Sequence, residues 1–510
     1  MPIFETIQTR GVPVKLFADQ VDQKARNQLI DLAESGLAEE FVAAMPDVHY
    51  GMGATIGSVF ASTWAVCPNA VGVDIGCGMA AVPFPGLHAD QLTAEKKWDL
   101  HRRIKERIPT GMQVHSLDQW APVLDNQGRT PWLSKQLHGR ALRTLGTLGG
   151  GNHFMEIVHD PSGQVWVMLH SGSRNLGKIT ADRYNEMAKQ FMAEKNLTPQ
   201  NADLNYLLVD SQEGQDYLTD MKWCQKFALA NRQAMLEILG QVMEVETKVA
   251  PEWGSMVNIH HNFCSRESCG YFNAQGEWVE KEFWVTRKGA TSARALQQGL
   301  IPGSMAVGSW LVEGLGNWES WYSCSHGAGR TKSRTASFAE IPQAAFERAM
   351  SGIVAETVPE LRDEAPQAYK DLAGVMECQC DLVKPVLRLL PLVNVKGWDP
   401  KGSQPWSGEK VNVEFVVAPE LGFEIEMVEA HLSENGGRPV AQWVAAQDYV
   451  LRASSKGVGS SRELWVKSKG DVDRKHLVVG RVVESDESHI AIHVDSVKKR
   501  ETLRRSPRIL

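Results

Sequence analysis

The sequence predicts an α+β fold, with a large core over residues 1–397 followed by a smaller α+β extension over residues 398–510. Three long stretches of the core have helical patterns: 91–145, 181–248 and 340–384. Short apolar runs, such as Val165–Leu169 and Leu390–Val395, are instead typical of buried strands. The combination of helical stretches and separate strands indicates the α+β class.

Length and composition set broad limits on function. The 510 residues can bury a large core, and 43% hydrophobic with 23% charged residues is ordinary for a globular protein. The net charge of −7 excludes a global basic field, so a nucleic-acid partner would need a local basic patch. Neither a signal peptide nor a membrane-spanning run is found, which favours a cytoplasmic location. The eight cysteines form no dense framework and are expected to be free thiols.

The extension begins at a segment with the composition of a linker, Trp398–Pro405. Three later segments alternate in hydrophobicity as strands do: Val411–Val417, His476–Val483 and His489–Val494. A helix is expected over Pro439–Arg452. The basic end, Lys498–Arg508, is either a solvated tail or a contact for the phosphates of a nucleic acid.

Two segments near the start of the core place polar residues among glycines. After a helical run at Gln23–Glu40, the segment Met45–Gly53 contains Asp47 and is expected to be an irregular loop. In Pro68–Met79, three glycines alternate with a carboxylate and a thiol in an otherwise apolar run. Burying a carboxylate or a thiol costs free energy unless the group is paired or bound to something. The carboxylate and the thiolate, three residues apart, could both bind one metal ion. A glycine-rich strand with one capped aspartate is the alternative.

Histidines follow glycines or apolar runs at three further places. Leu145–Glu156 places His153 after three consecutive glycines, in a pattern that is neither a P-loop nor a dinucleotide fingerprint. An apolar run leads directly into His170, at the expected end of a strand. A third run ends in His260 and His261, and neighbours on a strand point to opposite faces. Only one of these two histidines should therefore reach a given site.

The segment Ser323–Arg330 is a candidate nucleophile loop. His326 precedes Gly327 and Gly329, which allow the backbone to approach a ligand closely. Arg330 adds a fixed fork of donors that suits phosphate oxygens. A tight turn with a surface histidine is the alternative interpretation of this segment alone.

Taken together, these residues indicate metal-assisted chemistry on phosphate. The ligand-type residues are Asp74, Cys77, His153, His170 and His261. Thiolate, imidazole and carboxylate ligands suit borderline divalent ions such as Mn²⁺, Zn²⁺ or Co²⁺, and five ligands exceed one tetrahedral site. The phosphate-type cations are Arg174, Arg287, Lys288, Arg330 and Lys332. Metal ligands beside such cations indicate phosphoryl or nucleotidyl transfer.

Several segments resemble, in order, the motifs of the RtcB family, the 3′-phosphate RNA-splicing ligases. The segments are MPDVHYGMGATIG, PNAVGVDIGCGM, LGTLGGGNHFMEI, HSGSRNLG, HHN, VTRKGATSA, IPGSMAVGS and SCSHGAGRTKSRT. The resemblance runs from about residue 40 to Lys396-Gly397, where the chain ends in many members. Residues 398–510 depart from that pattern, so their role is left unassigned.

The resemblance implies mixed and antiparallel sheets around a central metal cleft that holds two Mn²⁺ ions, with GTP as the cofactor. The five ligand-type residues would bind the metal ions, and Cys77 would bridge them. His326 would accept GMP, while Asp47 and Arg330 would serve the RNA termini or the transition state. The guanylate pocket would be formed by Asn152, His153, Phe154, Met155, Glu156, His261, Asn262, Pro302, Gly303, Ser304, Met305, Ser309, His326, Gly327, Ala328, Gly329 and Lys396.

The implied function is ligation of RNA 3′-phosphate or 2′,3′-cyclic phosphate ends to 5′-hydroxyl ends, in tRNA splicing or RNA repair. The protein is expected to act as a monomer without membrane association; some family members need an archease-type activator. Two alternatives use the same residues. One is a metal-dependent phosphoesterase acting on RNA ends, and the other is a non-catalytic RNA-binding relative. The sequence does not identify the RNA substrate.

Overall fold

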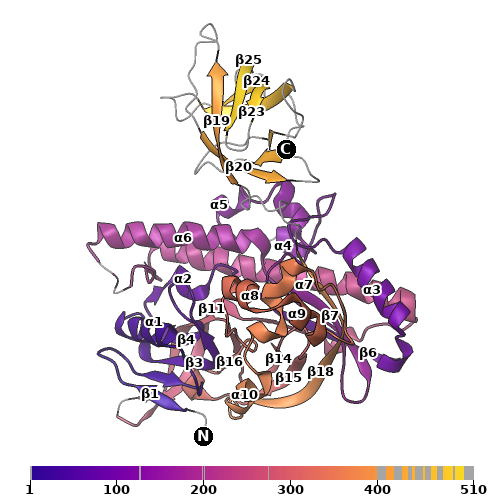
Figure 1. The fold of residues 1–510 in the computed structure, drawn as a ribbon. Helices are drawn as coiled ribbons and strands as arrows, with labels where there is room; N and C mark the ends of the chain where they lie inside the picture. Colours follow the sequence, from indigo (N-terminus) through magenta and orange to yellow (C-terminus); the bar gives the residue numbers. More distant parts are fainter. Residues whose placement is uncertain are drawn as a thin grey trace. The chain divides into compact units, whose positions relative to one another are not determined.

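The computed structural model describes residues 3–398, apart from 126, 127, 198, 200 and 274, and beyond residue 398 it describes the strands of one sheet. The chain divides into two compact units, Met1–Trp398 and Asp399–Leu510 (Figure 1). The first unit combines helices with largely antiparallel sheets, which confirms the α+β prediction for the core.

The larger sheet of the first unit nearly closes into a barrel. Its strands are, in spatial order, β10 (Val257–His260), β6 (Gly78–His88), β8 (Gln164–Ser171), β7 (Phe154–His159), β18 (Val383–Lys396), β15 (Ser309–Gly314) and β14 (Gln298–Pro302). Each neighbouring pair on this path is antiparallel, and the short β17 (Val354–Ala355) adds a parallel pairing to β18. The two end strands, β10 and β14, also contact each other, which brings the ends of the sheet together.

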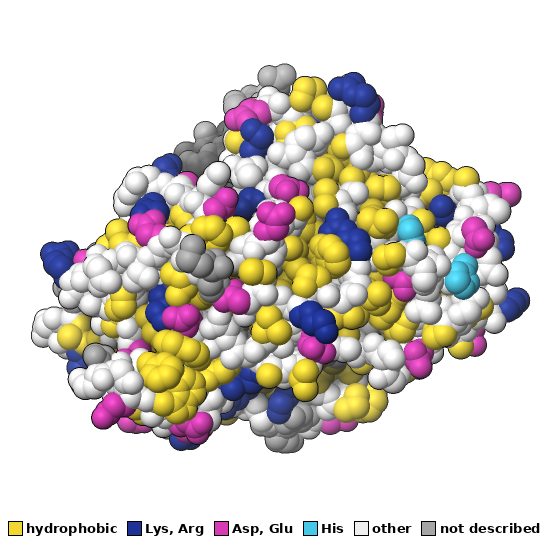
Figure 2. All heavy atoms as spheres, turned by 90° about the horizontal axis from the view of Figure 1, so that it is seen from below, with side chains coloured by type: hydrophobic (Ala, Val, Ile, Leu, Met, Phe, Trp, Pro, Cys, Tyr) yellow, Lys and Arg dark blue, Asp and Glu magenta, His cyan; other side chains and the backbone are white. Residues whose placement is uncertain are grey.

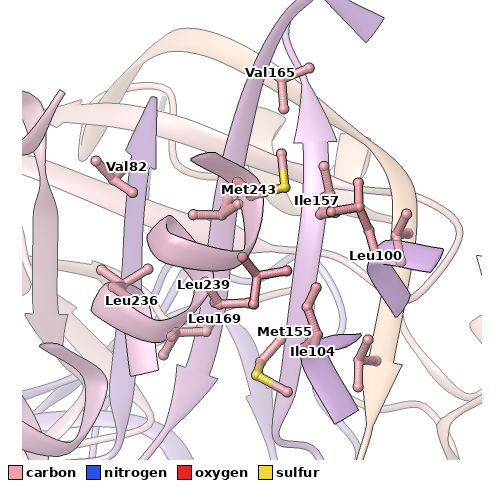
Figure 3. Close-up of a cluster of buried hydrophobic side chains, with 14 of the residues drawn as sticks. Val82, Leu100, Ile104, Met155, Ile157, Val165, Leu169, Leu236, Leu239 and Met243 are labelled. Atoms are coloured by element: carbon pink, nitrogen blue, oxygen red, sulfur yellow. The ribbon is translucent and has the colours of Figure 1, made fainter. Parts of the chain in front are cut away.

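Both faces of this sheet are apolar. Neighbouring residues on a strand point to opposite sides, and on these strands consecutive residues are apolar. On β6, Ala80 and Val82 face outward, against α3 (Ala94–Arg107) and α7 (Gln212–Thr247). Figure 3 shows this outer cluster, in which strand side chains meet Leu100, Ile104, Leu236, Leu239 and Met243. The inner cluster is formed by Met79, Ala81, Val158, Trp166, Met168, Val257, Leu300, Leu311 and Leu389. Two packed layers therefore hold the strands in register.

A second sheet contains the N-terminal strands. Its order is β1 (Glu5–Ile7), β2 (Val14–Leu16), β3 (Glu39–His49), β4 (Ile56–Ser62), β12 (Trp278–Lys288) and β11 (Asn262–Phe272). The β2–β3 pairing is parallel, and α1 (Gln23–Glu34) packs Leu29 and Leu32 against this sheet. The expected helical run to Glu40 ends at Glu34, since Gly36 follows with a φ of +78°.

The expected loop at Met45–Gly53 is wrong in its first half. Residues 45–49 continue β3, and Asp47 is fully buried there. The stretch 340–384 is also less helical than expected. It contains the short helices α9 (Gln343–Ala349) and α10 (Leu372–Glu377), and only 3₁₀ turns where Pro359 and Pro366 interrupt the helical pattern.

Two long helices lie beside each other, and one of them, α7, packs on strands β6, β8 and β10 of the near-barrel. α6 (Arg174–Glu194) and α7 run side by side, and α7 carries Asn231 and Arg232 with no exposed surface (Figure 1). Their lengths agree with the helical pattern expected over 181–248. No helix in the described part of the chain is long and apolar enough to cross a membrane.

The second unit contains a seven-stranded sheet, in the order β22-β21-β20-β19-β25-β24-β23. Three of its strands coincide with predicted ones: β19 (Glu409–Val417), β24 (Lys475–Ser485) and β25 (His489–Lys498). The helix expected over Pro439–Arg452 is wrong at both ends, where β21 (Pro439–Gln442) and β22 (Arg452–Ala453) pair with each other. Residues 443–451, most of the expected linker and the basic end after Lys498 lie outside the described residues.

The charged side chains on one face of the molecule are mixed in sign, as the modest net charge predicts (Figure 2). On the face in Figure 2, Lys and Arg side chains alternate with Asp and Glu and form no continuous basic area. Anion binding on this face would therefore depend on a local group of residues rather than on a broad field.

Candidate metal centre and nucleotide pocket

Strand pairing brings candidate metal ligands from distant parts of the sequence to one end of the near-barrel. β6 begins at Gly78, directly after Cys77, and its first residues pair with the last residues of β8, which carries His170. β7 begins at Phe154, directly after His153, and Phe154 pairs with His170. The antiparallel register thus places one thiol and two imidazoles at the same edge.

The same edge receives the end of β10. Its last residue, His260, pairs with the start of β6, and the backbone N–H of His261 donates to the carbonyl of Cys77 at 2.8 Å. The two adjacent histidines diverge as the strand argument predicts. His261 faces the ligand cluster, whereas Nδ1 of His260 lies 2.8 Å from the carbonyl oxygen of Gly76. Asp74 reaches the cluster from the loop between α2 (Pro68–Val71) and β6.

The ligand atoms form two groups that share one residue. Cys77, His170 and His261 form the first group, and Asp74, Cys77 and His153 form the second; within each group the atoms lie within 4.8 Å of one another. Sγ of Cys77 is 3.2 Å from Nε2 of His170 and 3.4 Å from Nε2 of His153. Nε2 of His153 is 3.0 Å from Oδ2 of Asp74. A residue common to both groups has the position that a bridging ligand requires.

The hydrogen bonds behind these residues fit metal binding. Nδ1 of His153 lies 2.9 Å from the carbonyl of Leu148, and Nδ1 of His170 lies 3.1 Å from that of Asn152. A carbonyl can only accept, so each Nδ1 donates and each Nε2 keeps its lone pair for a metal ion. Oδ1 of Asp74 is buried and has no hydrogen-bond partner among the described residues. The donor set suits a borderline divalent cation.

Burial controls the charges in this cluster. It lowers the pKa of His170 and of His261 well below the usual value, helped by neighbouring imidazoles, so both are neutral as ligands must be. Burial also raises the pKa of the Cys77 thiol well above its usual value, and Asp74 adds to this. A bound cation would reverse that preference and favour the thiolate. Burial would raise the pKa of Asp74 too, but His153 and Arg174 outweigh it and lower that pKa.

His326 lies beside this cluster and against a buried carboxylate. It follows β16 (Ser323–Ser325), which pairs with β13 (Ala290–Ser292). Its ring centroid is 4.9 Å from that of His261. Nδ1 of His326 is 2.6 Å from Oδ2 of Asp47, which also accepts from the backbone N–H groups of His326 at 3.1 Å and Gly327 at 3.3 Å. Three contacts to one carboxylate oxygen fix the imidazole relative to the cluster.

Asp47 is suited to hold a positive charge on this imidazole. Burial alone would raise the pKa of Asp47, but His326, His49 and Lys370 together lower it below its usual value. The carboxylate is therefore ionised while it touches Nδ1. This contact was not predictable from local patterns, because β3 and β16 are separated by most of the core sequence.

A cavity of about 270 Å³ opens next to His326. Its walls include most residues expected for a guanylate pocket: Asn152, Phe154, Glu156, Pro302, Gly303, Ser304, Met305, Ser309, His326, Gly327, Ala328, Gly329 and Lys396. His170 and Arg330 also line it. Four expected residues do not line it. Two of these, His153 and His261, belong to the candidate ligand groups instead. The Met155 side chain lies in the outer apolar cluster on the other face of β7, and Asn262 binds the backbone of Asp74 and Gly289.

The cavity wall contains two buried carboxyl groups with different protonation preferences. Burial raises the pKa of Glu156 to about 7, although Asn394 donates to it at 2.6 Å. Burial would also raise the pKa of Glu364, but Lys396 and Arg334 outweigh it and lower that pKa to about 2. Glu364 accepts from Lys396 at 2.9 Å. One wall therefore offers a carboxyl that titrates near neutrality beside a fixed ion pair.

The expected phosphate-type cations divide into two sets. Arg174 lies near the cluster, with Nη1 3.4 Å from Nδ1 of His153, and Arg330 lines the cavity, where its Nη1 lies 3.2 Å from Oε1 of Glu364. The other three are engaged elsewhere, which corrects the expectation that they surround a phosphate. Arg287 is fully buried and pairs with Glu267, Lys288 donates to the carbonyls of Met52 and Asn69, and Lys332 pairs with Glu340.

Sequence reasoning missed six residues of the cavity wall: His49, Ile56, Arg334, Glu364, Tyr369 and Asn394. Asn394 had a usable signal, because it is a polar residue inside an apolar strand run. Glu364 and Tyr369 had none, since they lie in a stretch expected only to be helical. All eight cysteines are free, as expected.

Comparisons with known proteins agree with these features. A family model described as tRNA-splicing ligase RtcB matches residues 28–128 and 123–397. The RNA-splicing ligase RtcB of Escherichia coli K12 is 40% identical over 418 residues, covering 77% of this chain and 100% of that protein. RNA-splicing ligase RtcB of Mycobacterium tuberculosis H37Rv is 29% identical over 423 residues, covering 69% and 96%. tRNA-splicing ligase RtcB of Aeropyrum pernix is 27% identical over 470 residues, covering 76% and 95%.

Proposed function

The chain belongs to the RtcB family of tRNA-splicing ligases, and on that premise we propose that it is a GTP-dependent RNA ligase. It joins RNA 3′-phosphate or 2′,3′-cyclic phosphate ends to 5′-hydroxyl ends through a covalent His326–GMP intermediate. One observation carries the proposal: His326 lies in a nucleotide-sized cavity beside two ligand groups that share Cys77.

His326 is the nucleophile of the first step. Asp47 contacts Nδ1, so Nε2 carries the lone pair that attacks the α-phosphorus of GTP. The new P–N bond forms as the bond to pyrophosphate breaks. The imidazole becomes positively charged in this step, and the ionised, buried Asp47 stabilises that charge. Asp47 is therefore proposed to orient His326 rather than to contact RNA directly.

Two divalent ions, Mn²⁺ in our proposal, would be held by the Cys77–His170–His261 and Asp74–Cys77–His153 groups and would neutralise charge on phosphate oxygens. The protein's own groups orient the nucleotide. Glu156 and Lys396 offer an acceptor and a donor for the edge of the base, and Phe154 lines the same cavity.

The second and third steps use the reactive P–N bond. An oxygen of the RNA 3′-phosphate attacks the phosphorus of His326–GMP, the P–N bond breaks, and the activated RNA end carries GMP. The 5′-hydroxyl of the other strand then attacks the RNA phosphorus and releases GMP. Arg330, on the cavity wall, is proposed to stabilise charge on the RNA end. A cyclic phosphate is first opened by water at the same centre.

Covalent guanylylation is the direct test. The full-length chain is incubated with α-labelled GTP and Mn²⁺, and an acid-labile, alkali-stable adduct is expected. His326→Ala should form none. His159→Ala is the matched control, since this histidine lies at the far end of β7, where its Nδ1 lies 2.8 Å from the carbonyl of Asp160, and it should form the adduct normally.

The outcomes separate the alternatives. A wild-type chain that forms no adduct but hydrolyses cyclic or terminal phosphates would be a phosphoesterase. RNA binding without either reaction would indicate a non-catalytic relative. We further propose that the chain acts as a cytoplasmic monomer on free RNA ends; adding an archease-type protein to the ligation assay would show whether turnover needs an activator.

A further inference from the structure

A fully buried arginine lies behind the metal ligands on the side away from the cavity. Arg232 is in the middle of α7 and has no exposed surface. In the described part of the chain it donates hydrogen bonds only to neutral oxygens, those of Asn258, Gly76 and Ser171, and its Nη2 packs against the neutral ring of His260. Burying a guanidinium without a carboxylate partner costs free energy. The position of its hydrogen bonds indicates what this cost could serve.

Three of the four contacts of the guanidinium fall next to a candidate metal ligand in the sequence. Nη1 donates to the carbonyl of Gly76 at 2.8 Å and to that of Ser171 at 3.0 Å, and these residues adjoin Cys77 and His170. Nη2 lies 3.1 Å from Nδ1 of His260, which adjoins His261; this is a packing contact, because that Nδ1 faces the carbonyl of Gly76. The three neighbours therefore correspond to the three members of one ligand group.

The fourth contact fixes the orientation of the fork. Nε of Arg232 donates to Oδ1 of Asn258 at 2.7 Å, and Asn258 lies on β10. With Nε held, the planar guanidinium can point only one way, so Nη1 and Nη2 reach the ends of β8 and β10 and the start of β6 together. A lysine has the same charge but no rigid fork.

We propose that Arg232 is the positioning residue of the Cys77–His170–His261 group, joining three strand ends so that their side chains meet at one ion. This inference rests on the proposed metal site. The adjacent Asn231 shares one of these segments, since its Nδ2 donates to Oγ of Ser171 at 3.2 Å and to the carbonyl of Gly172 at 3.1 Å, and it also reaches a second segment. It binds the backbone of Gly146 and Thr147, in the loop that leads to His153.

The test is Co²⁺ binding by full-length Arg232→Lys. Binding is measured by calorimetry and by the absorption band of Cys-ligated Co²⁺. The wild type should bind two equivalents. Arg232→Lys should lose about tenfold or more in affinity at one equivalent and show a weaker thiolate band. Arg287→Lys is the matched control, because Arg287 is equally buried but pairs with Glu267; it should lower the melting temperature and leave Co²⁺ binding unchanged.

Each outcome gives a decision. A folded Arg232→Lys variant that binds both equivalents with wild-type affinity would overturn the inference. A wild-type chain that binds no Co²⁺ would instead overturn the metal site itself. If Arg232→Lys does not fold, Asn258→Ala replaces it, since that change keeps the charge and frees the fork. It should weaken one equivalent severalfold, and unchanged affinity would again contradict the proposal.

Discussion

Cys77 is the single residue on which both ligand groups depend. Cys77→Ala should therefore lose both Mn²⁺ equivalents, whereas His261→Ala should keep one, because His261 belongs to one group only. Bound manganese per chain, measured by elemental analysis after dialysis, checks this. Cys77→Ala should also lose both guanylylation and cyclic-phosphate opening. Normal rates of either reaction in Cys77→Ala would contradict a shared centre.

Glu156 predicts a pH dependence of stability. Burial raises its pKa to about 7 from an ordinary 4.5, so the folded state holds this proton more tightly than the unfolded state. The contribution is fully present below pH 4.5 and is lost as the pH rises through 7. The free energy of unfolding of the metal-free wild type, minus that of Glu156→Gln, should fall by about 3 kcal/mol between pH 4.5 and 8.

Urea unfolding across this pH range measures the difference. Glu377→Gln, at an exposed surface carboxyl, serves as the control and should follow the wild type at each pH. A Glu156→Gln difference that stays constant with pH would mean that the carboxyl is ionised in the folded protein throughout.

At the scale of residues, the sequence predicted several side chains that the structure brings together, but not every contact that they make. Asp74, Cys77 and His153 lie among glycines and apolar residues, and polar side chains are costly to bury there without partners. That setting predicted them as candidate metal ligands. The partnership of Asp47 with His326 was not predictable, since it joins strands far apart in the chain. Met155 shows the converse error, because membership of a motif does not decide which face of a strand a side chain occupies.

At the scale of elements, the turn after β16 closes against β3 only because residue 329 is a glycine. Gly329 has a φ of +74°, and a Cβ there would lie 2.4 Å from the carbonyl oxygen of Asp47. Gly329→Ala should therefore push Asp47 away from His326 and slow adduct formation at least tenfold. Gly352→Ala is matched in backbone strain, with a φ of +87°, but no atom lies within 4 Å of its Cβ.

Both substitutions should cost about 1 kcal/mol through the left-handed backbone. In addition, only Gly329→Ala should slow guanylylation, measured as the rate of labelled adduct formation. Equal rates in the two variants would show that the close approach to β3 does not matter for His326.

Strands and long helices were predictable at this scale because periodic apolar patterns survive in one dimension. The errors came where a proline or a remote strand overrode the local pattern. The stretch after Ala349 is divided by Pro359 and Pro366, and Pro439–Gln442 pairs in a sheet rather than starting a helix.

For the whole molecule, the decisive feature is the pairing order of the near-barrel, which no local pattern contains. Antiparallel neighbours β6, β7, β8 and β10 put Cys77, His153, His170 and His261 at one end. The sequence supplied the ligand types, and only the register shows that they meet.

The unit boundary gives the last prediction. Lys396 pairs with Phe154 across the sheet and contacts Glu364, and Nε1 of Trp398 donates to Glu356 at 2.7 Å, so the described residues of the pocket all belong to the first unit. A chain of residues 1–398 should form the GMP adduct at the full-length rate. A chain of residues 1–395 should form far less, because Glu364 loses its lysine partner. Ligation and RNA affinity, measured separately, should change in 1–398 if the second unit binds RNA. Failure of a folded 1–398 chain to form the adduct would mean that residues 399–510 are needed for the first step.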